Sequence, residues 1–392
     1  MNAAVLGQDF EGVVEALPTV FLIALLGYFS VLAGGSLWRF RVGLGLRKKA
    51  IRVLDIFPRC SLMLMSSRNL LVFQSLLCFL LQASILAIYF TQSGFGFDLR
   101  AFGIANPALR PVVLIISNYS VVIGSHCLAR YVERKERVLL ACTLLLTVGL
   151  VFFGGRGSVL GIYLGVAICY LVLRGRGISL FRIIALASLI VIFLLYLGLV
   201  RAGEYSLGEF FGILAALLLY GDTFSDLRDF AWVYSSWNHV FWAGKTYLAA
   251  LMAFIPRVAS QFRDTWGLGA ATAATAGLDP QVHPGLRPGI FGEGFLNFGV
   301  LGVICVGLMF GLILRRIDID VKHALAPPRP SMMKAIASTT QFGVALFLAI
   351  TAGFSSLYIL AGIYIFSWLC LRVASLVHSP GIQSSDAHSS VS

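Results

Sequence analysis

Residues 17–38 read LPTVFLIALLGYFSVLAGGSLW, a run of 22 residues without a charged side chain. About 20 consecutive apolar residues are needed for a helix to cross a hydrocarbon core about 30 Å thick. Eight lysines and arginines follow directly, between residues 39 and 68. An apolar run bounded by a basic loop indicates a membrane-spanning helix whose basic end faces the cytoplasm.

The same pattern recurs along the chain, which is 58% hydrophobic and only 12% charged over 392 residues. Soluble domains are about 45–50% apolar and about 25% charged. The sequence therefore predicts an all-α, polytopic transmembrane protein of about nine to eleven spans. Nine spans are expected at about 17–38, 69–91, 110–129, 138–154, 158–173, 183–200, 293–314, 335–354 and 357–377.

The net charge of +12 is typical of nucleic-acid-binding proteins, but here it follows the membrane topology. Of the 30 lysines and arginines, 21 fall in the loops or helix ends on one side of the predicted spans and nine on the other. The richer side is expected to be cytoplasmic. This places the N-terminus outside and the C-terminus inside, and it leaves no role for nucleic acid.

The longest stretch without a predicted span is expected to form one large external loop, residues 201–292. It contains two apolar pieces, 210–220 and 247–255, each shorter than the roughly 17 residues a span requires. Both are predicted to be short interfacial or re-entrant helices, and if both crossed there would be eleven spans. The predicted organisation is N-terminal spans over 1–200, the loop over 201–292, C-terminal spans over 293–377, and a disordered cytoplasmic tail over 378–392.

Nine basic residues remain on the external side, where the charge rule depletes them. Arg156 lies in the turn Gly-Gly-Arg-Gly-Ser at 154–158, Arg201 begins the loop, and Arg257 follows Ile255-Pro256. One interpretation is anchoring, in which the arginines reach into the lipid headgroups. The other is recognition of an anionic ligand, because charge near membrane depth is often functional.

The densest group of polar candidates is HPGLRPGIFGEGFLNFG at 283–299. Its prolines and glycines indicate a shaped loop that enters a spanning helix. It carries His283, Arg287, Glu293 and Asn297. His283 has the side chain best suited to acid–base work near neutral pH, although a structural histidine remains an alternative. Glu293 also fits a purely structural role, as a carboxylate that complements the partial positive charge of a helix N-terminus.

Metal and cofactor sites are not indicated. Asp222, Asp226 and Asp229 share one helical face and could hold a cation, but a solvated face is favoured because no tight ligand loop is present. Asp318 and Asp320 resemble a metal-binding pair, yet they lie beside arginines and are expected in a solvated cytoplasmic loop. The seven cysteines show no zinc or disulfide spacing, and phosphate-binding glycine motifs are missing.

The order of these elements resembles the O-antigen polymerases, also called oligosaccharide repeat unit polymerases. The resemblance rests on the Gly-Arg turn at 154–158, the Ile-Pro-Arg element at 255–257, and the Gly-Glu-x₃-Asn-Phe-Gly helix start at 292–299. One departure is the Val258-Ala259 that follows Arg257, where the family often has a lysine–proline pair.

The resemblance implies a multi-pass enzyme of the bacterial inner membrane that polymerises undecaprenyl-pyrophosphate-linked oligosaccharide repeats. The product would be O-antigen, capsular polysaccharide or exopolysaccharide, made on the periplasmic face. A hydroxyl of one repeat attacks the anomeric carbon of another chain, and undecaprenyl pyrophosphate leaves. Membrane lipid, a chain-length regulator and a flippase are the further partners implied, with no cofactor.

Site roles follow from this chemistry. The leaving group is anionic, and arginine offers phosphate a planar donor fork. We expect Arg156, Arg257 and Arg287, with Arg201, to bind the pyrophosphate. His283 is predicted to be the general base, with Glu293 as its orienting partner or as the base itself. Asn297, one turn beyond Glu293, is predicted to contact the substrate.

Three alternatives remain on sequence grounds. An O-antigen ligase type enzyme would use the same donor with a lipid A core acceptor. A transporter or flippase of lipid-linked sugar is a different class, for which pseudo-repeats and charges within the spans would be expected. A membrane scaffold without chemistry would leave the external arginines unexplained.

Overall fold

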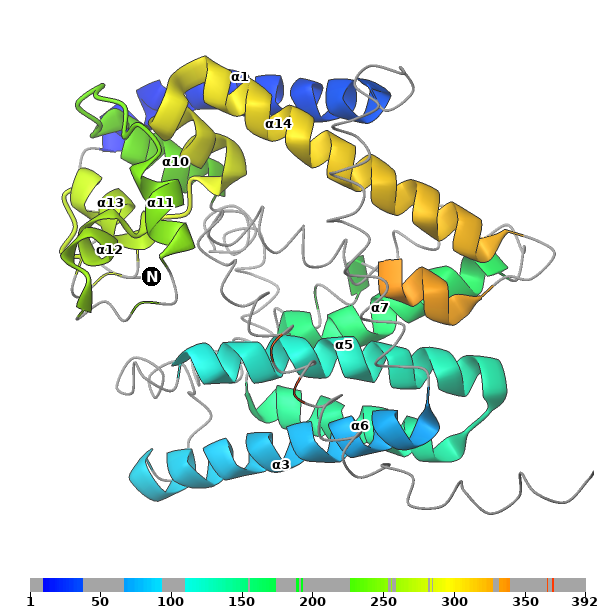
Figure 1. Ribbon diagram of the computed structural model, residues 1–392. Helices are drawn as coiled ribbons and strands as arrows, with labels where there is room; N and C mark the ends of the chain where they lie inside the picture. The colour runs from blue at the N-terminus through cyan, green and yellow to red at the C-terminus, as the bar shows by residue number, and fades with distance from the viewer. Residues whose placement is uncertain are drawn as a thin grey trace, which may run out of the picture.

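The computed structural model describes residues 10–37, 67–93, 110–153, 156–173, 226–252, 259–280, 285–326 and 331–338, with isolated positions at 188, 189, 192, 255, 283, 365 and 369. Every regular element in these ranges is a helix, in agreement with the predicted all-α class (Figure 1). Four helices are long and apolar enough to cross a membrane. They are α1 (Phe10–Leu37), α3 (Arg68–Ser93), α5 (Arg110–Arg134) and α14 (Gly289–Leu325).

Two further predicted spans, 138–154 and 158–173, form the shorter helices α6 (Arg137–Phe152) and α7 (Arg156–Leu173). With 16 and 18 residues, they reach about 24 and about 27 Å at about 1.5 Å per residue. The predicted spans that lie mostly or wholly outside the described residues are 183–200, 335–354 and 357–377. The expected total of nine to eleven spans therefore stays a prediction.

The helices α3, α5, α6 and α7 pack together and are joined by hydrogen bonds between side chains of different helices (Figure 1). Such bonds contribute about 0.6–2 kcal/mol each between helices in lipid. They join Gln82 Nε2 to Ser120 Oγ (2.9 Å), the Tyr119 hydroxyl to Gln74 Oε1 (3.1 Å), and the hydroxyls of Thr147 and Tyr163 (2.8 Å).

The other two long helices, α1 and α14, run in the same direction, cross at an angle, and approach closely through small residues (Figure 1). A Cβ atom on Gly34 would lie 2.3 Å from the Leu308 carbonyl oxygen, and one on Gly311 would lie 2.1 Å from that of Val31. Glycine is therefore required at both positions for the two backbones to meet, as in small-residue interfaces between membrane helices.

The described residues between 226 and 288, here named the loop unit, form four short helices beside the first halves of α1 and α14 (Figure 1). The predicted apolar piece 247–255 overlaps one of them, α11, which has only seven residues and is too short to cross a bilayer. The piece 210–220 lies outside the described residues. The four helices are α10 (Asp226–Ser235), α11 (Lys245–Leu251), α12 (Gln261–Trp266) and α13 (Leu268–Thr275).

One hydrophobic core joins the loop unit to both long helices. Because a single core is shared, the position of the loop unit on α1 and α14 is set by apolar burial. Its buried members include Val20 from α1, Phe230, Trp237 and Leu268 from the loop unit, and Leu296 and Val303 from α14.

Candidate functional site

The first part of α14 is interrupted by a kink at Phe298 and Gly299. Phe298 has φ −137° and ψ 15°, and Gly299 has φ 63° and ψ −149°. The backbone conformation of Gly299 is accessible essentially to glycine alone. A break in a helix leaves the carbonyl groups of the preceding turn without their usual N–H partners.

Three successive backbone N–H groups of the loop unit donate to this part of α14, two of them to carbonyl groups and one to a side chain. Trp242 N–H donates to the Leu296 carbonyl (2.9 Å) and Ala243 N–H to the Asn297 carbonyl (3.1 Å). Gly244 N–H donates to Asn297 Oδ1 (3.0 Å). Ala243 adopts a positive φ of 51°, a conformation that costs a non-glycine residue about 1–2 kcal/mol. The segment is therefore held in a strained turn by its bonds to the kinked helix.

Thr246, Glu293 and Asn297 form a connected polar network, here named the buried triad. Their exposed fractions are 1%, 0% and 0%. The Thr246 hydroxyl donates to Glu293 Oε1 (3.0 Å), and Asn297 Nδ2 donates to Thr246 Oγ1 (2.7 Å) and to the Glu293 carbonyl (2.9 Å). Removing one member would leave another buried polar group unsatisfied, at a cost of about 1–3 kcal/mol.

Tyr247, the neighbour of Thr246 in the chain, packs on the kink of α14. Its ring stacks on Phe298 with centroids 6.0 Å apart and planes 21° apart. Burial raises the pKa of the Tyr247 phenol, and the negative charge of Glu293 raises it further. The phenol therefore stays protonated at physiological pH.

A second polar group, the Asp229 cluster, comprises Asp226, Arg228, Asp229 and Arg287. Asp229 is only 6% exposed; its Oδ1 accepts from Arg228 Nη2 (3.2 Å) and its Oδ2 accepts from the Arg287 backbone N–H (3.3 Å). Burial raises the pKa of Asp226, while the Arg287 charge opposes this shift and the Asp229 charge adds to it. The prediction of a solvated acidic face is therefore wrong for Asp229, and Asp222 lies outside the described residues.

His283 lies on the connection between α13 and α14, residues 276–288, here named the return loop. Its hydrogen bonds are to other residues of this loop. Its backbone N–H donates to the Asp279 carbonyl (2.8 Å), and its ring Nδ1 accepts from the Gly285 N–H (3.1 Å). An Nδ1 that accepts a hydrogen bond leaves the ring proton of the neutral imidazole on Nε2. To take a proton at Nδ1, the ring would first have to release Gly285.

The predicted site residues thus fall into separate groups. Glu293 and Asn297 meet in the buried triad, Arg287 lies in the Asp229 cluster, and His283 lies on the return loop. Arg156 is the first residue of α7, so it begins a helix and does not stand within the predicted turn. Arg201 and Arg257 lie outside the described residues, and the expected convergence of the arginines stays a prediction.

One further expectation, the loop position of Asp318 and Asp320, is corrected. Asp318 and Asp320 belong to α14, which continues to Leu325, and not to a loop. Asp318 pairs with Arg315 (2.6 Å) and Lys322 (3.0 Å), and Asp320 pairs with Arg316 (3.0 Å). Pairs spaced three and four residues apart are the ordinary ion pairs of a helix surface.

Sequence reasoning missed Thr246 and the burial of Asp229. Thr246 stands in no motif, and its role depends on a partner on a different helix. The i, i+3 spacing of Asp226 and Asp229 marked a shared helical face but not what covers it.

Within the ranges that the structure covers, no three His, Cys, Asp or Glu side chains gather as a metal site. Comparison with protein-family models, curated proteins and solved structures gave no match.

Proposed function

We propose that this chain is a membrane glycosyltransferase that polymerises undecaprenyl-pyrophosphate-linked oligosaccharide repeat units on the periplasmic face of the bacterial inner membrane. The observation that carries the proposal is the packing of the return loop against the start of α14. There, Arg287 stands two residues before the helix, and its backbone N–H is held by buried Asp229. The backbone of a basic residue is thus fixed at the head of an apolar spanning helix.

Helix ends support an anionic ligand at two of the predicted arginines. Arg156 begins α7 and Arg287 precedes α14, and the N-terminal end of a helix carries a partial positive charge. A cation there gains nothing from the helix dipole, whereas a phosphate gains from both the helix and the guanidinium. In the proposed reaction, the pyrophosphate leaves with the electron pair of its bond to the anomeric carbon, so this charge stabilises the leaving group.

The acceptor side of the reaction needs a group that receives a proton. The acceptor hydroxyl forms the new bond to the anomeric carbon and gives its proton to a base. His283 is half-buried, whereas the Glu293 side chain is fully covered and already accepts from Thr246. The difference in burial favours His283 as the base, after its Nδ1 releases the Gly285 N–H, and gives Glu293 a positioning role, in which it fixes the loop segment on α14.

The proposal is tested with the purified full chain in lipid nanodiscs, supplied with lipid-linked repeat units. A ladder of products longer than one repeat, resolved on gels, is the expected result. A matched deletion strain should accumulate single repeats on lipid or on their final acceptor. Products of one repeat only, transferred to a lipid A core, would replace the proposal with a ligase; no transfer by the active, folded chain would remove it.

A further inference from the structure

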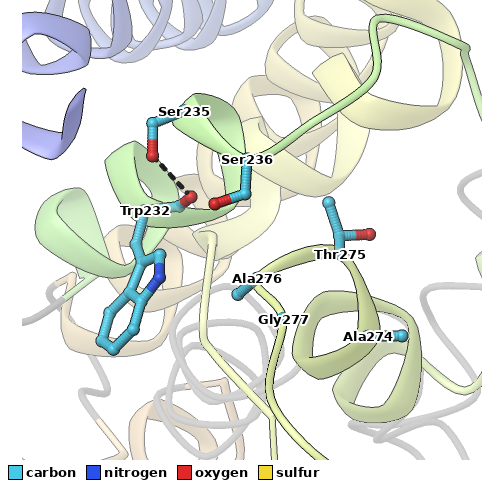
Figure 2. A pocket seen from close by; sticks show the side chains of 7 residues that line it. All are labelled: Trp232, Ser235, Ser236, Ala274, Thr275, Ala276 and Gly277. Atoms are coloured by element: carbon cyan, nitrogen blue, oxygen red, sulfur yellow. Dashed lines mark hydrogen bonds between the residues drawn. The ribbon is translucent and has the colours of Figure 1, made fainter. Parts of the chain in front are cut away.

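A hollow of about 320 Å³ opens between the end of α10 and the end of α13 (Figure 2). It is separate from the buried triad and from the Asp229 cluster. Its size is at the lower end of the range for small-molecule sites, about 300–1,000 Å³. Trp232 and Ser235 line it from α10, Ser236 lines it directly after α10, and Ala274 and Thr275 line it from α13.

The lining combines an aromatic side chain with hydroxyl groups and contains no charge. Ser235 Oγ donates to the Trp232 carbonyl (2.9 Å) and keeps its lone pairs for a ligand donor (Figure 2). The Ser236 side chain is exposed, and among the described residues none bonds its hydroxyl. It can therefore both donate to and accept from a ligand.

This chemistry selects among ligands. A phosphate would require a cation or several converging donors, which the lining does not offer. A sugar ring has hydroxyls that donate and accept, and apolar C–H faces that pack on an indole. An uncharged ring with hydroxyl groups fits the mixed lining better than a purely apolar chain.

The position of the hollow decides which part of a saccharide it would hold. On α10 the hollow begins at Trp232, three residues beyond Asp229, and extends to Ser235, six residues beyond it. At about 1.5 Å per residue, these two lining residues lie roughly 5 and roughly 9 Å from Asp229 along the helix axis. A ring in the hollow would therefore lie away from the pyrophosphate, further along the chain of sugars.

We infer that the hollow between α10 and α13 is a binding subsite for one sugar ring of the saccharide, distant from the reacting carbon. The identity of the saccharide rests on the proposed function, whereas the subsite itself rests on the lining. Trp232 supplies the stacking surface, and Ser235 and Ser236 supply hydrogen bonds. Such a subsite would recognise the repeat unit without taking part in bond breaking.

The test uses oligosaccharide of one and two repeats, released from the host polysaccharide by mild acid, and the full chain in nanodiscs. Binding is measured by isothermal titration calorimetry for wild type, Trp232→Ala and Ala274→Trp. Ala274 is exposed at the rim, so a tryptophan there fills the hollow without removing a contact in the core. Thr265→Trp, at an exposed position of α12, is the matched control.

Wild type and Thr265→Trp should bind alike, and Ala274→Trp and Trp232→Ala should each bind about tenfold more weakly. Equal binding by wild type and Ala274→Trp would overturn the subsite, as would the absence of binding to wild type. Polymer formation by the same preparations separates the two proposals. Oligosaccharide binding that depends on the hollow, without polymer, would sustain the subsite and remove only the polymerase.

Discussion

The hydroxyl of Thr246 donates a hydrogen bond to Glu293 Oε1 at 3.0 Å, across 47 residues of sequence. This bond links the loop unit to α14 at the level where the helix is kinked. Three backbone N–H groups from the neighbouring turn reinforce the link. The first prediction concerns the strength of this junction.

Replacing Thr246 by valine keeps the shape of the side chain and removes the donor to Glu293. We expect a loss of about 1–3 kcal/mol in the free energy of unfolding, because a buried carboxyl oxygen and an Asn297 donor each lose a partner. The loss is measured as a lower midpoint of thermal unfolding in nanodiscs. Thr265→Val, at an exposed position, is the control. Equal midpoints for the two variants would show that the bond contributes nothing.

Gly34 and Gly35 are adjacent in α1 but differ in their neighbours. A Cβ atom at Gly34 would lie 2.3 Å from the Leu308 carbonyl oxygen, whereas one at Gly35 would lie 3.7 Å from that of Gly311. Gly34→Ala should therefore separate α1 from α14 and lower the thermal midpoint strongly. Gly35→Ala should be neutral or stabilising by about 0.5–1 kcal/mol, since alanine favours helix. A larger loss for Gly35→Ala would contradict the observed packing.

The raised pKa of Asp226 makes stability depend on pH. The folded chain holds this proton more tightly than the unfolded chain, so the stabilisation is present below the ordinary pKa of 3.8. It is lost as pH rises from that value through the raised pKa of the folded state. Asp226→Asn cannot ionise, so its midpoint relative to wild type should rise as the pH increases from about 4 through the raised pKa of the folded state. A difference that stays constant with pH would contradict this.

If Arg156 binds the pyrophosphate through its planar donor fork, a positive charge alone should not be sufficient for polymerisation. Arg156→Lys retains the charge but loses the bidentate fork, so polymerisation should slow by about 30- to 1000-fold, or about 2–4 kcal/mol of barrier. His283→Ala should also impair polymerisation. Polymer length on gels at matched membrane expression is the measurement, with Arg137→Lys as control. Wild-type polymer from both Arg156→Lys and His283→Ala would remove these assignments.

The predicted topology is checked with reporter fusions. The 21-to-9 division of basic residues predicts which side each loop occupies. A cytoplasmic signal at Thr272 would place the loop unit in the wrong compartment and exclude the proposed reaction. Cytoplasmic signals are expected at Lys48, Arg134, Arg176 and Lys322, and external signals at Gly96 and Thr272.

Sequence alone was sufficient for the helical class and for the presence of α1, α3, α5 and α14, although α14 continues to Leu325, well beyond the predicted end at 314. The physical reason is that a helix closes its backbone hydrogen bonds locally, and about 20 apolar residues suffice to prefer lipid whatever their neighbours are. The sequence also identified residues 283–299 as a shaped loop that enters a helix, because glycine and proline restrict the local backbone in any context.

Only the tertiary structure decided what those residues contact. Glu293 is buried and is hydrogen-bonded to Thr246, which in turn accepts from Asn297. Asp229 is buried and accepts a hydrogen bond from the backbone N–H of Arg287. The hollow beside Trp232 exists because the ends of α10 and α13 come together. Burial and hydrogen-bond partners of this kind depend on long-range packing, so side-chain spacing along the chain does not contain them.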